Sequence, residues 1–145
     1  MSGVRSTSVW KAYSVATGYL ADVAALSASA ALFGNVSATA AGIFIAAGII
    51  ELAALVSNRL VGGIGHRLRA AATPEEEATA ALAGLAIFAF TAVLMFADVA
   101  VADWLLPSFD ISGFPAYVGT VALVFVASFA VYSPLYVTRR LRQVV

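Results

Sequence analysis

The feature that most constrains this chain is a set of four apolar runs, each about as long as a membrane-spanning helix. They cover about residues 10–33, 36–60, 78–106 and 116–137 of the 145. A helix of about 20 apolar residues crosses the hydrocarbon core of a bilayer and keeps its backbone hydrogen bonds inside the segment. The composition agrees, with 62% hydrophobic and 11% charged residues against about half and a quarter in soluble proteins. We therefore expect an all-α integral membrane protein with a single membrane domain, residues 1–145.

The positive charges indicate the direction in which the spans run. Lys and Arg accumulate in cytoplasmic segments of membrane proteins. Here they lie before the first span, between the second and third spans, and after the fourth: Arg5, Lys11, Arg59, Arg67, Arg69, Arg139, Arg140 and Arg142. The pattern predicts an up-down bundle of four transmembrane helices in the cell (plasma) membrane, with both termini and the connection 61–77 in the cytoplasm.

The connection 61–77 has features of its own. Gly62, Gly63 and Gly65 are expected to interrupt the second helix, and residues 64–72 are expected to form a short basic segment against anionic headgroups. The residues expected to contact lipid headgroups are Arg67, Arg69, Arg139, Arg140 and Arg142.

The residue counts exclude most cofactor chemistry. The chain has no cysteine and a single histidine, His66, so it lacks the ligand sets of zinc, iron–sulfur and membrane haem sites. The equal numbers of basic and acidic residues, 8 and 8, provide no basic field for nucleic acid. The glycine-rich stretch lacks the Lys-Ser/Thr of a phosphate-binding loop. We expect no cofactor, no metal, no nucleic-acid partner and no catalytic residue, and hence no enzyme.

Two carboxyl groups inside the spans are the most informative residues. At a rise of 1.5 Å per residue, Asp22 lies about 18 Å above Trp10, and Glu51 lies about 12 Å above Arg59. Because Trp10 and Arg59 are both expected near the inner boundary of the membrane, the two acids come within about one helical turn of each other in depth.

Two tyrosines are expected to complete an intramembrane polar cluster. Tyr19 and Tyr132 fall at comparable depth to the two acids when the same counting is applied. Their phenols are expected to donate hydrogen bonds to the carboxyl groups, so the predicted cluster is Tyr19, Asp22, Glu51 and Tyr132.

The absence of a cation in the spans limits what these acids can be. Every Lys and Arg is expected at or beyond the cytoplasmic boundary, so one or both acids should be protonated for part of the time near neutral pH. An ionisable group in hydrocarbon is retained when it is paired, hydrogen-bonded, neutral or functional. Two explanations stay open: acids that hold helices or subunits together, and acids that bind a proton or cation.

Three further acids fall nearer the outer ends of the spans. Counted from Ala78, Asp98 is about 30 Å up and therefore at the outer boundary, with Asp103 and Asp110 beyond it. We expect solvated external acids, with a cation-attracting vestibule as the alternative.

Two functions from different classes follow. The first is a non-catalytic subunit or helper of a larger membrane complex, which buries its small-residue faces and acids against partners. The alternative is a proton- or cation-coupled carrier or channel that uses Asp22 and Glu51, expected as a homo-oligomer because four helices alone enclose little space. The expected partners are the lipid bilayer and either further copies of the chain or other membrane subunits.

Overall fold

The computed structural model describes the backbone of residues 3–71 and 77–144 and, within these ranges, the side chains of residues 11–67 and 81–131. It contains four helices, α1 (Gly3–Leu32), α2 (Ala40–Ala71), α3 (Glu77–Leu105) and α4 (Phe114–Val144). Two three-residue strands, β1 (Val36–Ala38) and β2 (Phe109–Ile111), join them. All four helices contain a stretch long and apolar enough to cross a membrane. The expectation of an all-helical membrane protein is confirmed at this level.

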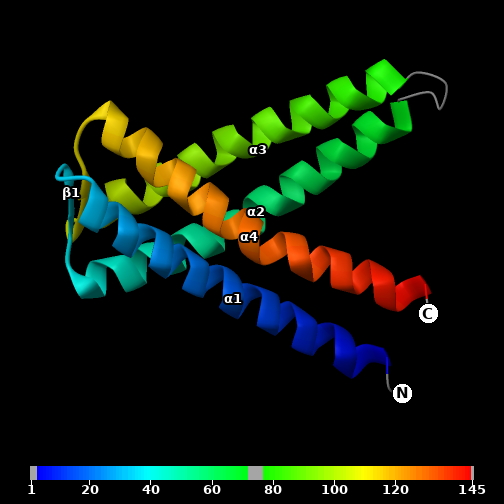
Figure 1. Ribbon diagram of the computed structural model, residues 1–145, viewed down its shortest axis with the longest axis horizontal. Coiled ribbons are helices and arrows are strands. Elements are labelled where there is room, and N and C mark those ends of the chain that lie inside the picture. Colours follow the sequence, from blue (N-terminus) through cyan, green and yellow to red (C-terminus); the bar gives the residue numbers. More distant parts are fainter. Residues whose placement is uncertain (1–2, 72–76, 145) are drawn as a thin grey trace.

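The helices pack as two pairs. α1 packs mainly against α4, and α2 packs mainly against α3, whereas α3 and α4 contact each other little. The two chain termini, the end of α2 and the start of α3 lie at one end of the molecule, and the two strands lie at the other (Figure 1). We call these the terminal end and the ribbon end. The two pairs diverge toward the terminal end (Figure 1).

The ribbon end is held together by backbone contacts that the sequence did not predict. β1 and β2 pair antiparallel, with Val36 opposite Ile111 and Ala38 opposite Phe109. α2 therefore begins at Ala40, four residues later than expected, and the Thr39 hydroxyl accepts a hydrogen bond from the amide of Gly42 at 3.0 Å, as a helix N-cap does. Three-residue strands between spans leave no periodic signal long enough to read.

Close approach between the helical and connecting segments also defines this end. A Cβ on Gly42 would lie 2.3 Å from the backbone oxygen of Ser108, so only glycine fits there. Gly113 adopts φ +91°, a left-handed conformation that glycine adopts without steric cost. Ser29 of α1 and Thr120 of α4, both fully buried, are hydrogen-bonded to each other through their hydroxyls.

The terminal half of α2 corrects the prediction of a loop over residues 61–77. The helix continues without interruption through Gly62, Gly63 and Gly65 to Ala71, so the basic segment expected from residue 64 is part of this helix as far as Ala71. Glycines are frequent in transmembrane helices, where breaking backbone hydrogen bonds costs more than the low helix propensity of glycine. Gly65 is buried against α3, because a Cβ there would lie 3.5 Å from the side chain of Ile87, an ordinary van der Waals distance.

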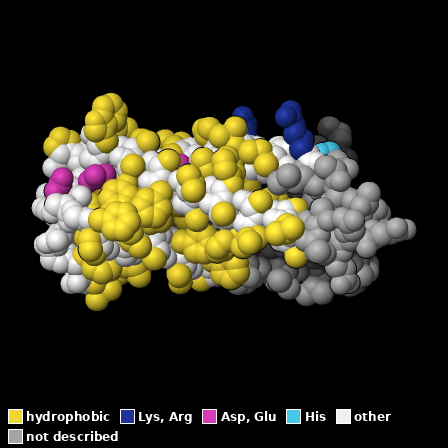
Figure 2. Space-filling model, turned by 90° about the horizontal axis from the view of Figure 1, so that it is seen from above, with side chains coloured by type: hydrophobic (Ala, Val, Ile, Leu, Met, Phe, Trp, Pro, Cys, Tyr) yellow, Lys and Arg dark blue, Asp and Glu magenta, His cyan; other side chains and the backbone are white. Residues whose placement is uncertain are grey.

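The surface of the molecule is apolar over the length of the candidate spans. Large side chains such as Leu52, Leu82 and Val126 are more than 60% exposed. Figure 2 shows hydrophobic side chains over the middle of one face, carboxylates at the ribbon end, and Lys and Arg side chains toward the terminal end. An apolar surface of this extent is typical of a lipid-facing protein, because a water-soluble monomer rarely exposes apolar patches larger than a few hundred Å².

Candidate functional site

A cavity with a volume of about 320 Å³ lies between the two helix pairs and is lined from all four helices. Asp22 lies well inside the candidate span Lys11–Leu32, and Glu51 lies well inside the candidate span Ala40–Arg67. The polar side chains in its lining are Asp22, Glu51, Ser57, Asn58, Thr91, Asp98 and Ser128. The cavity therefore brings three carboxyl groups together within the membrane-spanning part of a single chain.

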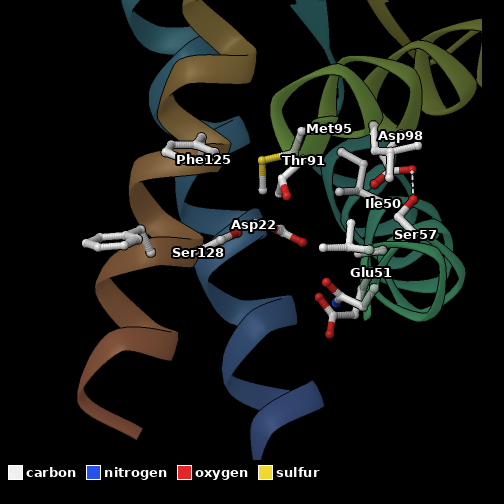
Figure 3. A pocket seen from close by; sticks show the side chains of 14 residues that line it. Asp22, Ile50, Glu51, Ser57, Thr91, Met95, Asp98, Phe125 and Ser128 are labelled. Carbon is white, nitrogen blue, oxygen red and sulfur yellow. Dashed lines mark hydrogen bonds between the residues drawn. The ribbon is translucent and has the colours of Figure 1, made fainter. Parts of the chain in front are cut away.

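Asp22 is the most deeply buried of the three acids. Its side chain is 2% exposed and projects from α1 into the space between the helix pairs (Figure 3). Ser128 of α4 lies beside it (Figure 3). Among the described residues, no hydrogen-bond partner lies within reach of its Oδ1 atom. Because burying a polar atom without a partner is costly, this oxygen is available for a proton or a ligand.

Glu51 projects from α2 toward the same space as Asp22 (Figure 3). It is 7% exposed and lines the same cavity. The structure thus brings together the two acids that the depth counting placed at the same level.

Asp98 corrects the prediction of a solvated external acid. It is 7% exposed, lines the cavity, and accepts a hydrogen bond from the Ser57 hydroxyl of α2 at 3.1 Å. The candidate span of α3 ends at Leu105. Asp98 therefore lies seven residues, about 10 Å, inside that end, whereas counting from Ala78 places it at the outer boundary.

The two other outer acids lie outside the cavity. Asp103 accepts a hydrogen bond from the backbone amide of Ile111 at 2.8 Å and so fastens β2 to the end of α3. Asp110 lies in β2 and is exposed. Asp103 thus has a structural role that the expectation of a solvated acid missed, and only Asp110 is exposed as expected.

Tyr19 does not join the acids as predicted. Its hydroxyl donates to the backbone oxygen of Phe44 at 3.2 Å, and it is absent from the described lining of the cavity. The Tyr19 phenol is thus used in a hydrogen bond to the α2 backbone and not to a carboxyl group.

Several predicted site residues have side chains outside the described part of the chain. These are Tyr132, Arg69, Arg139, Arg140 and Arg142. Arg67 is described and is exposed on α2 near the terminal end, a position compatible with the headgroup contact expected for it.

The electrostatic character of the cavity is acidic. Its described lining contains three carboxyl groups and no Lys, Arg or His. Arg59 of α2 has an exposed side chain and is not part of the lining. A cavity with this composition attracts protons and cations and disfavours anions.

Comparisons of the chain with protein-family models, with curated proteins and with solved structures give no match.

Proposed function

We propose that this small multi-pass membrane protein is a proton- or cation-coupled carrier in which Asp22 and Glu51 bind the transported or coupling ion. The observation that carries the proposal is the position of Asp22, a carboxyl 2% exposed, well inside its candidate span, with one oxygen unpartnered among the described residues. Ionisable groups in transmembrane segments that face a cavity mark ion and proton pathways in membrane proteins. Such residues lower the stability of the protein and are retained where function needs them.

The carrier is proposed to exchange a proton for a cation at Asp22. The described groups that face Asp22 are Glu51 from α2, Asp98 from α3 and the uncharged Ser128 from α4. A cation that enters the cavity stabilises the ionised form of these carboxyls, and a proton neutralises them. The two ligands therefore compete, and acidification releases the cation.

The four helices of one chain form the walls of the cavity. The expectation that four helices alone enclose too little space for a ligand path is therefore not needed to explain the site. A homo-oligomer is accordingly not needed to form the site, and it stays a prediction. The same holds for the orientation with both termini in the cytoplasm of the cell (plasma) membrane. The asymmetric charge supports this orientation, because every Lys and Arg lies in a helix segment toward the terminal end.

The alternative function, a non-catalytic subunit of a larger membrane complex, makes a different use of the same residues. It requires the acids to hold helices or partners together, whereas Asp22 has an oxygen without a described partner. The hydrogen bond from Ser57 to Asp98, which joins α2 to α3, fits this function. The exposed apolar faces fit lipid as well as a partner subunit.

The carrier proposal is tested with purified protein in liposomes that contain a pH-sensitive dye. A pH gradient is imposed, and Na⁺, K⁺, tetramethylammonium and benzyltrimethylammonium chlorides are added in turn. We expect at least one cation to discharge the gradient through the wild-type protein and through Asp110→Asn, the matched change at an exposed acid outside the cavity. Asp22→Asn should not discharge it. If no cation discharges the gradient, or if Asp22→Asn is as active as wild type, the proposal is wrong.

A further inference from the structure

The cavity has an apolar wall as well as an acidic one. Phe125 and Phe129 of α4, with Leu94 and Met95 of α3, line it together with the three carboxyls. The Phe125 ring is held in place by an edge-on contact with Phe88 of α3, with ring centroids 5.4 Å apart. An inorganic ion such as Ca²⁺ or Mg²⁺ is coordinated by oxygen ligands and not by aromatic rings. An organic cation, in contrast, is attracted to the face of an aromatic ring.

The carboxyl groups do not converge on one point. Among the residues that the structure describes, no three His, Cys, Asp or Glu side chains lie close enough to hold a single metal ion. Asp22, Glu51 and Asp98 are instead distributed over the wall of one cavity, on three different helices. This arrangement fits a charged group on a larger molecule better than it fits a bare ion that is coordinated by several oxygens.

The volume of the cavity is sufficient for a small organic molecule. Its volume of about 320 Å³ is at the lower end of the range of about 300–1,000 Å³ that small-molecule sites occupy. A site of this kind is mostly apolar, with a few polar groups that orient the ligand.

The acids differ in their availability for a ligand. Asp98 already accepts a hydrogen bond from Ser57 at 3.1 Å. Asp22 has an unpartnered oxygen, is 2% exposed and points into the cavity (Figure 3). The charged group of a ligand is therefore best neutralised at Asp22, with the half-buried Phe125 available for its apolar part.

We propose that the cavity binds a small organic cation, with its positive charge against Asp22 and its apolar group against Phe125. This inference rests on the proposed carrier function and names its substrate class. The ligand is a monovalent ammonium-type ion with an aromatic or alkyl group, small enough for the cavity.

The probe is radiolabelled benzyltrimethylammonium, measured by equilibrium dialysis against the full-length protein in detergent, with empty micelles as the blank. We expect saturable binding to wild type, competition by the unlabelled cation, and little competition by its neutral isostere neopentylbenzene or by Na⁺. Asp22→Asn should weaken binding at least tenfold, and Phe125→Leu several-fold. The matched changes at exposed residues of the ribbon end, Asp110→Asn and Phe114→Leu, should leave binding unchanged.

Three outcomes overturn the inference: no saturable binding to wild type, equal competition by the neutral isostere, or unchanged binding by Asp22→Asn. The competition experiments use only wild-type protein, so a variant that fails to fold does not affect them. The two proposals fail in different ways. If Na⁺ or K⁺ discharges the pH gradient in liposomes while benzyltrimethylammonium neither binds nor discharges it, the organic-cation inference fails and the carrier function stands. If no cation discharges the gradient, the carrier function itself fails.

Discussion

Replacing Asp22 by leucine should stabilise the protein, and the sign of this effect separates the two functions. Asp22 is 2% exposed, and its Oδ1 atom lacks a hydrogen-bond partner among the described residues. A buried polar group without a partner costs about 1–3 kcal/mol. The cavity of about 320 Å³ in front of it has room for the larger leucine side chain. We therefore expect Asp22→Leu to raise the free energy of unfolding by about 1–3 kcal/mol.

The assay is thermal unfolding in detergent, followed by the loss of the monodisperse peak in size-exclusion chromatography. A change of 1 kcal/mol corresponds to about 2–4 °C in Tm for a chain of similar size, so the expected increase is measurable. The control of opposite sign is Asp103→Leu, which removes the acceptor of the Ile111 amide at 2.8 Å and should lower Tm. If Asp22 instead holds helices together, Asp22→Leu should lower Tm as well. That result would refute the reasoning.

Two further predictions concern packing and hydrogen bonding. Gly42→Ala should destabilise the fold by about 1–3 kcal/mol, because the new Cβ would lie 2.3 Å from the Ser108 backbone oxygen. Gly63→Ala has nothing within 4 Å of the added Cβ and should leave Tm unchanged or slightly higher, so equal effects of the two changes would contradict the packing described for the ribbon end. Ser57→Ala and Asp98→Asn in a double-mutant cycle should show a coupling of about 0.6 kcal/mol, with about 1.7 kcal/mol as the upper limit for membrane proteins. A coupling of zero in unfolding measurements would mean that the 3.1 Å hydrogen bond adds no stability.

The parts of the fold that could be predicted from the sequence are those that the bilayer dictates. Apolar runs of spanning length identify the four helices because a membrane imposes both their length and their composition. Depth counting brought Asp22 and Glu51 to one level because both helices rise by the same distance per residue. These arguments need no knowledge of how the helices pack.

The errors arose where helix packing and local contacts decide the outcome. Asp98 became part of the cavity through the register of α3 on α2, which places it beside Ser57. Tyr19 donates its hydrogen bond to the backbone carbonyl of Phe44 on α2 and not to a carboxyl group. The glycines of α2 remained helical because a membrane helix tolerates them, and the three-residue strands were too short to leave a pattern. For Asp98 and Tyr19, the deciding contact comes from another segment of the chain.

The central claim, that a cation and a proton exchange at Asp22, is tested most directly by counting protons. Purified wild-type protein in weakly buffered detergent solution is titrated with a cation that discharges the pH gradient in liposomes, and released protons are measured with a pH indicator. We expect a release that saturates together with binding in wild type and in Asp110→Asn, and no release from Asp22→Asn. Saturable binding without any proton release, or an undiminished release from Asp22→Asn, would contradict the claim.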